Sequence, residues 1–181
     1  MYIIKTDIAG VLILEPDIFN DNRGYFFESY SEAKFREATG LDITFIQDNE
    51  SLSSYGVLRG LHFQNPPYEQ AKLVRVVKGK VWDVTVDIRR DSPTFGKYVA
   101  VELSGENKRQ LFIPRGFAHG YVVLEDNTIF QYKCDNYFAP EHQGAVIWND
   151  PQIGIMWPIP KEDIILSEKD KNNPALYNYT N

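Results

Sequence analysis

The sequence has few of the residues that carry covalent or metal chemistry. It contains one cysteine and three histidines among 181 residues. Cys134 alone cannot form a disulfide within the chain, and no secretory leader is recognisable, so we expect a reducing, cytoplasmic location. The formal net charge of -6 argues against a general nucleic-acid-binding protein. The longest early apolar run, residues 11–14, is far too short to cross a membrane.

The apolar content, by contrast, is sufficient for an ordinary globular core. Hydrophobic residues make up 43% of the chain and aromatic residues 14%. A chain of this size buries about 70% of its unfolded surface without disulfides. We therefore predict one domain over residues 1–181, with a core over about 40–150 and a C-terminal wrap over 151–181.

Alternation with a period of two is the main structural signal. In residues 81–88 the even positions are apolar and the odd positions after 81 are Asp83, Thr85 and Asp87, which predicts a half-buried strand. The segment 78–80, centred on Gly79, predicts a hairpin turn after a strand over 72–77. Residues 99–103 alternate in the same way, and 104–107 are typical of the next turn.

Further short strands follow at nearly regular spacing. We expect them near 11–14, 25–29, 43–47, 110–113, 119–124 and 128–134. Ser31 as an N-cap and Gly40 as a C-terminal stop predict one helix over 32–39. Many short strands with turn signals predict a mainly β chain that forms an antiparallel barrel or jelly roll with short flanking helices.

Arg59, His62 and Lys72 place one potential base and two cations within 14 residues. Removal of a proton beside a carbonyl group needs such a set, because a base takes the proton and a cation stabilises the enolate oxygen. Each residue also has an ordinary interpretation. His62 could be a satisfied core residue, and Lys72 could be a strand-end lysine that extends to water.

The segment from Pro114 to His119 has the Pro-x-Gly-x-x-His form of the second cupin motif. In metal cupins this histidine joins two histidines and a carboxylate of the first motif. Here Gln64 occupies the position of a second histidine after His62, which leaves a poor set of metal ligands. We therefore expect a cupin-like antiparallel jelly roll that holds no metal. We also expect no redox cofactor, because the sequence has no glycine-rich dinucleotide fingerprint.

Nearly end to end, the chain resembles the dTDP-4-dehydrorhamnose 3,5-epimerase family of dTDP-L-rhamnose biosynthesis. The resemblance rests on blocks at 21–28, 47–49, 58–64, 70–75, 91–96, 113–120, 132–133 and 167–170. Among them are Asp-Asn-Arg-Gly-Tyr-Phe-Phe-Glu, Leu-Arg-Gly-Leu-His-Phe-Gln and Ser-Glu-Lys-Asp. So many blocks in one order make the resemblance highly specific.

The resemblance implies four catalytic residues. His62 becomes the general base, and Asp170 orients its imidazole. Lys72 lies near the carbonyl oxygen and stabilises the enolate, and Tyr132 delivers a proton to the face opposite His62. Without the resemblance, Asp170 would be interpreted as a surface charge and Tyr132 as a core aromatic residue.

The resemblance also implies the substrate-binding positions. They are Arg23, Glu28, Gln47, Asn49, Arg59, His119, Gln143 and Lys169. The arginines suit a diphosphate, since a guanidinium group contacts two oxygens at once. The family often has Glu where this chain has Gln143. Because an amide carries no charge, we expect hydrogen bonding and no ionic role at that position.

The implied activity inverts carbons 3 and 5 of dTDP-4-dehydro-6-deoxy-D-glucose to give dTDP-4-dehydro-L-rhamnose. The resemblance further implies a homodimer whose N-terminal strands pair across the interface. One alternative is an epimerase of a related nucleotide 4-keto sugar that acts at a single carbon. A second is a non-catalytic jelly roll that binds a nucleotide sugar, which would have no use for His62, Asp170 and Tyr132 together.

Overall fold

Strands dominate residues 1–179, the part of the chain that the computed structural model describes. The strands are β1 (Tyr2–Lys5), β2 (Leu12–Glu15), β3 (Phe19–Asp21), β4 (Gly24–Phe26), β5 (Gln47–Ser53), β6 (Leu58–Gln64), β7 (Lys72–Lys78), β8 (Lys80–Asp87), β9 (Tyr98–Ser104), β10 (Gln110–Ile113), β11 (Phe117–Val123), β12 (Thr128–Cys134) and β13 (Gln143–Ala145). The helices are α1 (Glu32–Thr39) and four 3-10 helices, η1 (Pro140–His142), η2 (Lys161–Asp163), η3 (Asp170–Asn172) and η4 (Leu176–Asn178).

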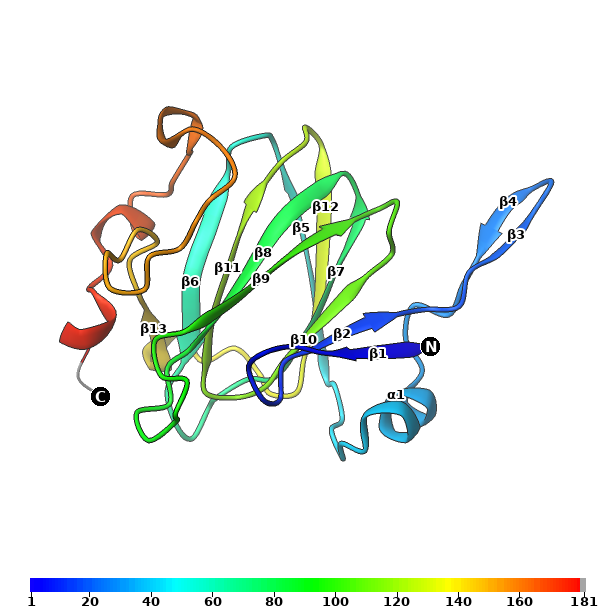
Figure 1. Ribbon diagram of the computed structural model, residues 1–181, viewed down its shortest axis with the longest axis horizontal. Helices are drawn as coiled ribbons and strands as arrows, with labels where there is room; N and C mark the ends of the chain where they lie inside the picture. Colours follow the sequence, from blue (N-terminus) through cyan, green and yellow to red (C-terminus); the bar gives the residue numbers. More distant parts are fainter. Residues whose placement is uncertain (180–181) are drawn as a thin grey trace.

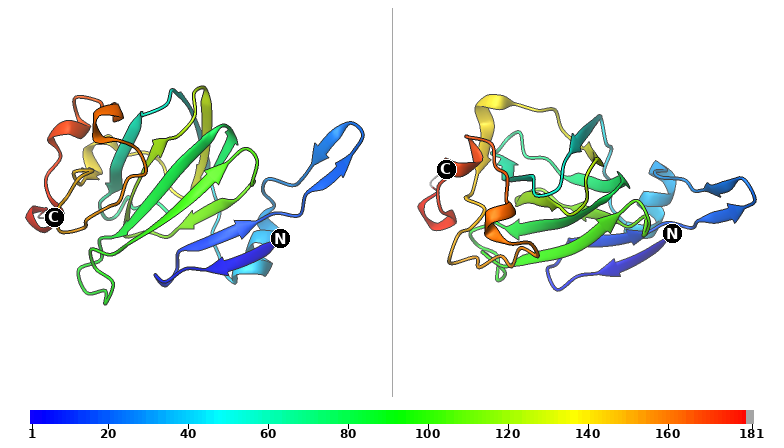
Figure 2. Two further views of the ribbon diagram at one scale, coloured as in Figure 1. Left: turned by 45° about the horizontal axis from the view of Figure 1, so that its top comes forward. Right: turned by 90° about the horizontal axis from the view of Figure 1, so that it is seen from above.

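Two sheets pack face to face (Figure 1). The six-stranded sheet has the order β1-β2-β10-β7-β12-β5, and the five-stranded sheet has the order β13-β6-β11-β8-β9. Neighbouring strands within each sheet are antiparallel. The predicted mainly β, antiparallel jelly roll is therefore confirmed. The β3–β4 hairpin forms an arm that projects away from both sheets (Figure 2).

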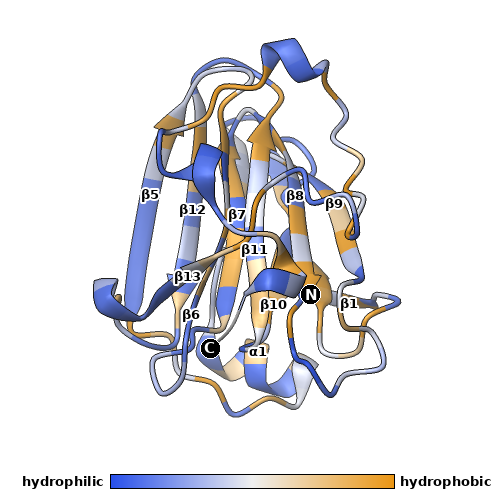
Figure 3. Cartoon of the chain, turned by 90° about the vertical axis from the view of Figure 1, so that its left-hand side faces the viewer, coloured by the Kyte–Doolittle hydropathy of each residue, from blue (hydrophilic) through white to orange (hydrophobic). Residues whose placement is uncertain are grey.

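The main core lies between the sheets and is built from β-branched and aromatic residues. Its fully buried members include Val74, Val81, Leu111 and Phe130. Figure 3 shows hydrophobic residues along β7 and hydrophilic residues along the edge strand β5. The apolar part of the inner space therefore supports the fold, and the polar part near β5 is left for a site.

Strand β8 corrects one prediction. It is buried on both faces, because Val84 and Val86 pack with Ile153 and Leu176 of the C-terminal segment. The alternating polar residues Asp83, Thr85 and Asp87 are also fully buried. The expectation of a half-buried strand is wrong, because the C-terminal segment covers the apolar face and the polar face points into the protein.

The turn at Gly79 is a second correction. Strand β7 pairs with β10 and β12, whereas β8 pairs with β11 and β9, so residues 78–80 connect the two sheets and form no hairpin. Gly79 has a φ of 81°, and a Cβ there would lie 2.2 Å from Thr128 Oγ1. The local turn signal was correct, but it carried no information on which strands pair.

Other local predictions vary in accuracy. Helix α1, β10 and β12 have the predicted bounds, and β2 and β11 lie within two residues of theirs. The strand expected near 43–47 begins only at Gln47, and the strand expected near 25–29 is the short β4. Strands β1, β3, β6 and β13 were not predicted.

The C-terminal segment crosses the outer face of the five-stranded sheet and contains η2, η3 and η4 (Figure 1). The last two residues of the predicted wrap over 151–181 lie outside the described residues. None of the helices within residues 1–179 is long and apolar enough to cross a membrane.

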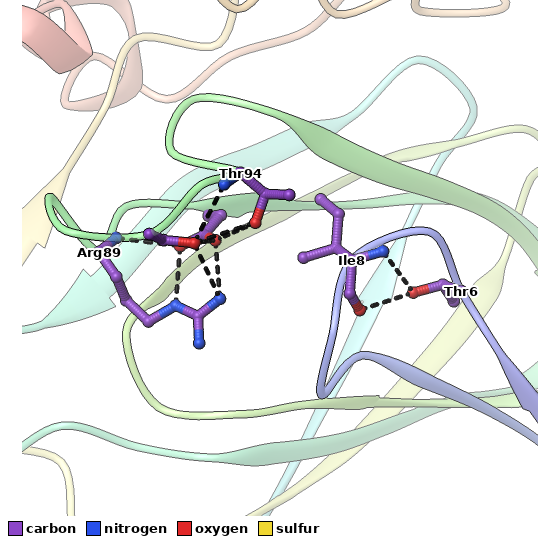
Figure 4. Close-up of polar contacts among 6 residues, drawn as sticks. Thr6, Ile8, Arg89 and Thr94 are labelled. Carbon is purple, nitrogen blue, oxygen red and sulfur yellow. Dashed lines mark hydrogen bonds and ion pairs between the residues drawn. The ribbon is translucent and has the colours of Figure 1, made fainter.

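At the end of β8, the buried carboxylate of Asp87 organises the loop that follows. It accepts hydrogen bonds from the Arg89 guanidinium at 2.9 and 2.7 Å, and from the Ser92 and Thr94 hydroxyls at 2.6 Å each. Figure 4 labels two members of this network, Arg89 and Thr94, and marks its hydrogen bonds with dashed lines. Burial alone would raise the pKa of Asp87, but these donors lower it to about 2.

Candidate active site

A cavity of about 800 Å³ opens between the two sheets. Its walls come from β5, β7 and β12 of one sheet and from β6 and β11 of the other. The C-terminal segment closes one side with residues 165–170. The volume lies in the range of sites that enclose most of a small ligand.

Ten of the twelve predicted site residues line this cavity. They are Gln47, Asn49, Arg59, His62, Lys72, His119, Tyr132, Gln143, Lys169 and Asp170. They come from positions up to 123 residues apart, from 47 to 170, so the fold and not the sequence order brings them together.

His62 and Asp170 form a hydrogen-bonded pair, with 2.6 Å between His62 Nε2 and Asp170 Oδ1. Asp170 is buried and also accepts from the Asn173 amide at 3.3 Å. Burial would raise the pKa of Asp170, but its interactions with His62 lower it. A carboxylate can only accept, so Nε2 carries the proton and Nδ1 keeps a lone pair for a second proton.

The wall that carries His62 depends on a close approach of β6 to β11. Gly60 has a φ of 127°, and a Cβ there would lie 2.6 Å from the Cα of Gly120. Only glycine allows this contact. It leaves His62 and His119 as cross-strand partners on the same wall.

Lys72 and Tyr132 lie on the other sheet, at the start of β7 and within β12. The Lys72 ammonium is 6.0 Å from the centre of the Tyr132 ring. Burial raises the pKa of Tyr132, which keeps its hydroxyl protonated. Burial lowers the pKa of Lys72, which makes its ammonium a stronger hydrogen-bond donor to a developing negative charge.

The cavity contains three cations that have no carboxylate partner within residues 1–179, namely Arg59, Lys72 and Lys169. Arg59 donates to the Ser53 hydroxyl at 3.3 and 3.2 Å. Lys169 donates to the Gln143 amide oxygen at 2.6 Å. In a chain of net charge -6, three uncompensated cations in one cavity indicate an anionic ligand.

The rim carries amide groups and one aromatic ring. Gln47 donates to the Asn49 side-chain oxygen at 3.0 Å and accepts from the backbone of Phe138 at 3.2 Å. Phe138 is 52% exposed and was not predicted as a site residue. Nothing in the sequence around it distinguishes its ring from an ordinary surface aromatic residue.

Arg23 and Glu28 do not reach this cavity. Arg23 lies on the projecting arm, with a side chain that is 85% exposed and paired with Asp21 at the tip of the hairpin. Glu28 is paired with Lys34 of α1. A single chain therefore assembles the cavity without two of the predicted binding residues.

Gln64 has a structural role. Its amide nitrogen donates to the backbone oxygens of Tyr68 and Tyr137 at 2.6 and 3.1 Å, and its oxygen accepts from the Ala139 N–H at 2.6 Å. Its hydrogen-bonding groups are thus engaged with backbone. Within residues 1–179 no group of three or more His, Cys, Asp or Glu side chains is arranged to hold a metal ion.

The prediction from the sequence did not include two buried polar groups of the cavity region. Asp83 contacts His119, and the Tyr121 hydroxyl lies 2.8 Å from Ser51 Oγ. Burial raises the pKa of Tyr121 to about 12. Asp83 is one of the alternating polar residues from which a half-buried strand was predicted, and this alternation does not distinguish a polar face in solvent from one inside the protein.

Comparison with known proteins identifies similar chains. A sequence model of the dTDP-4-dehydrorhamnose 3,5-epimerase family matches residues 5–178. A dTDP-4-dehydrorhamnose 3,5-epimerase from Salmonella typhimurium is 54% identical over 176 residues, which cover 97% of this chain and 96% of the relative.

Two solved structures are informative. A dTDP-6-deoxy-D-glucose-3,5-epimerase from Legionella pneumophila, in complex with dTDP-4-keto-L-rhamnose, is 48% identical with a TM-score of 0.95, covering 98% of this chain and 94% of that one. A 3′-monoepimerase from Streptomyces bikiniensis, in complex with dTDP-quinovose, is 35% identical with a TM-score of 0.90, covering 98% and 88%.

Proposed function

We propose, from the premise that this chain belongs to the dTDP-4-dehydrorhamnose 3,5-epimerase family, that it converts dTDP-4-dehydro-6-deoxy-D-glucose to dTDP-4-dehydro-L-rhamnose. It is an isomerase that inverts carbons 3 and 5. The full-length relatives above 50% identity carry this name, and the coverage in both directions is nearly complete.

The placement of His62 and Tyr132 on opposite sheets is the observation that carries the proposed mechanism. Inversion of a carbon requires a proton to leave from one face and another to arrive on the opposite face. A sugar ring held between the two walls has an imidazole base on one side and a protonated phenol on the other. Neither group alone could invert the carbon.

Carbons 3 and 5 both flank the ketone, so both carry acidified protons. His62 Nδ1 takes a proton, and Asp170 stabilises the imidazolium that forms. The negative charge moves to the ketone oxygen, where Lys72 stabilises the enolate. Tyr132 then protonates the opposite face. A positioned base and acid each contribute roughly 10²–10⁴-fold in rate, and one oxyanion donor contributes about 10²–10³-fold.

The remaining residues of the cavity suit the nucleotide. Arg59 and Lys169 are free to pair with the diphosphate, since their protein partners are neutral groups. Gln143 keeps a hydrogen bond to Lys169 but supplies no charge. The amides of Gln47 and Asn49 can bind a pyrimidine edge, and the Phe138 ring offers a surface on which a base can stack.

We further propose a homodimer in which the arm of one protomer delivers Arg23 and Glu28 toward the cavity of its partner. Strand β1 is an edge of the six-stranded sheet and is open to pairing. Phe19 and Phe26 on the arm are 64% and 67% exposed, which is unusual for large apolar side chains and favours a covered surface.

A mixing experiment tests this arrangement. Arg23→Ala and His62→Asn chains should each be inactive or weak. If the arm acts in the partner, a mixed dimer contains one site with an intact His62 and an intact Arg23, so mixing should restore activity. No gain on mixing, or sedimentation at the 20.9 kDa mass of one chain, would contradict the proposal.

We also propose that residues 1–181 form one domain and that the protein is cytoplasmic. The two sheets share a single inner core, and Cys134 is buried and free. Burial raises the pKa of the Cys134 thiol to about 11, so it is unreactive toward disulfide exchange. A fractionated cell extract would test the location.

Turnover in heavy water tests the function itself. The substrate dTDP-4-dehydro-6-deoxy-D-glucose should gain two deuterium atoms, at carbons 3 and 5, and the product should have both centres inverted. One deuterium atom would indicate a single-carbon epimerase, as in the relative from Streptomyces bikiniensis. Incorporation no greater than in substrate incubated without protein would indicate a binding module.

A further inference from the structure

A second histidine–carboxylate pair lies deeper in the same wall as His62. Both oxygens of Asp83 are 3.0 Å from His119 Nε2. Asp83 has no exposed surface and His119 is 7% exposed. Among residues 1–179, Asp83 makes no other side-chain hydrogen bond within the protein, so its carboxylate is committed to this one imidazole nitrogen.

The other nitrogen of His119 is open to the cavity. His119 Nδ1 has no hydrogen-bond partner in residues 1–179. Among these residues, Trp82 Nε1 is the only buried side-chain nitrogen or oxygen that lacks a partner, so His119 Nδ1 is not buried. His119 Nδ1 is therefore reached by solvent, and the cavity that His119 lines is the route. The ring lies nearly parallel to that of Phe130, at 23° and 6.2 Å between centres, so packing fixes its orientation.

The charge of the pair follows from its surroundings. Burial lowers the pKa of His119, and the Asp83 carboxylate opposes this only in part. Lys72 and His62 also disfavour a second proton on the ring. The imidazole is therefore neutral, with its one proton on the nitrogen that faces the carboxylate.

We propose that Asp83 is a positioning residue of this site, which holds the His119 proton on Nε2 so that Nδ1 accepts a hydrogen bond from a hydroxyl group of the sugar. This inference rests on the proposed function for the identity of the ligand. The ketone oxygen of the substrate is itself an acceptor, so His119 cannot bind it. The oxygen that becomes negatively charged is left to Lys72, and His119 selects sugars that carry a hydroxyl group at the facing position.

In both pairs, His62–Asp170 and His119–Asp83, a carboxylate holds the imidazole proton on Nε2, but the two histidines have different roles. His62 is 29% exposed at its side chain, so it can take a proton and return it. His119 is 7% exposed and lines the cavity, and Asp83 keeps its Nδ1 lone pair as a hydrogen-bond acceptor without making it a catalytic base. A substrate analogue without the facing hydroxyl group should lose affinity for the wild-type protein.

Nitrogen-15 NMR of the histidine rings tests the inference directly and needs no turnover. The chain has only three histidines, so His62→Asn and His142→Asn variants assign the spectrum. We expect His119 to be protonated on Nε2 alone at neutral pH. A proton on Nδ1, or on both nitrogens, would overturn the proposal. A protein with this tautomer but no epimerase activity would leave the tautomer standing and contradict the proposed function instead.

Asp83→Asn tests the consequence for catalysis. The amide can turn its N–H toward Nε2, which moves the imidazole proton to Nδ1 and replaces the acceptor with a donor. We expect kcat/KM to fall by about tenfold or more, the loss of roughly one hydrogen bond, while affinity for dTDP, which has no sugar, stays within about twofold.

The matched control is Thr85→Val, which removes another buried polar group from the same face of β8 and should keep activity. In a His119→Asn background, Asp83→Asn should have little further effect, because Asp83 acts through His119. Full activity of Asp83→Asn, or an equal loss in both backgrounds, would overturn the proposal. If Asp83→Asn fails to fold, the NMR spectrum of the wild-type protein still decides.

Discussion

Charged side chains have different hydrogen-bond partners in the loop after β8 and in the cavity between the sheets. Asp87 is buried and fully bonded, with Arg89, Ser92 and Thr94 around both of its oxygens. In the cavity, the partners of Arg59 and Lys169 among residues 1–179 are neutral groups. Charges with a complete set of protein partners stabilise the fold, whereas charges without one are available to a ligand. Substitutions in the two regions should therefore affect different measurements.

His62→Asn should have the largest effect on turnover. Loss of the base should reduce kcat by roughly 10²–10⁴-fold, with dTDP affinity and melting temperature almost unchanged. Calorimetry with dTDP and a thermal melt measure the last two. His142→Asn is the matched control, since this histidine lies outside the cavity lining and packs against the Tyr68 ring at 4.3 Å between centres. Near wild-type exchange of substrate protons with solvent by the variant would show that His62 is not the base.

Arg59→Ala should weaken binding without changing stability. Loss of a charged hydrogen-bond partner costs on the order of 1.5–3 kcal/mol, which is about 10- to 150-fold in the dTDP dissociation constant. Arg36→Ala serves as the control, because this arginine lies on α1 and is paired with Glu32 and Asp42. An unchanged dTDP affinity for Arg59→Ala would count against the diphosphate assignment.

Asp87→Asn should show the reverse pattern. The pKa of Asp87 is held at about 2, so the carboxylate contributes on the order of 2 kcal/mol of stability at neutral pH. The variant should melt about 4–8 °C lower and should keep its activity per folded molecule. Asp91→Asn, an exposed substitution in the same loop, should change neither the melting temperature nor the activity.

The pH dependence sharpens this prediction. Because the folded pKa of Asp87 is depressed, its contribution is present above the unfolded pKa of roughly 4 and is lost as the pH falls through about 2. The difference in unfolding free energy between wild type and Asp87→Asn should therefore shrink between these values. A constant difference across that window would contradict the linkage.

Removal of metal should have no effect on turnover. The amide of Gln64 is engaged with three backbone groups and is not free to bind an ion. Activity should be unchanged after extensive dialysis against a chelator. A loss of turnover that zinc or iron restores would contradict this prediction, and the same treatment of His142→Asn would show whether an adventitious surface site is involved.

Local signals in the sequence were sufficient where one element decides its own bounds. Ser31 caps α1 by accepting from the Lys34 N–H, and Gly40 ends it with a φ of 71°, so the helix was predicted correctly. Local signals were insufficient where the bounds of an element depend on its pairing with another strand. Strand β6 has Arg, Gly, His and Gln among seven residues, and this pattern conceals a strand that the close approach at Gly60 makes possible.

The candidate site shows the same division. The family resemblance located ten residues that the fold gathers into one cavity. Asp83 was missed because alternation along β8 cannot tell an inner polar face from a solvated one. Arg23 and Glu28 were predicted from motif position, and a single chain places them on or beside an arm that projects away from both sheets, outside the cavity lining. We propose that they act in a partner protomer, and a sequence pattern does not record such an exchange.

Tyr132→Phe in heavy water tests the central claim most directly, namely that base and acid act from opposite walls. His62 and the Lys72-stabilised enolate remain intact in this variant, so deuterium should still enter the substrate. Inverted product should fall by roughly 10²–10⁴-fold, with the largest effect at the carbon that Tyr132 serves, which the family resemblance suggests is carbon 5. An equal fall in exchange and inversion would contradict the account, because Tyr132 would then act before or during enolisation.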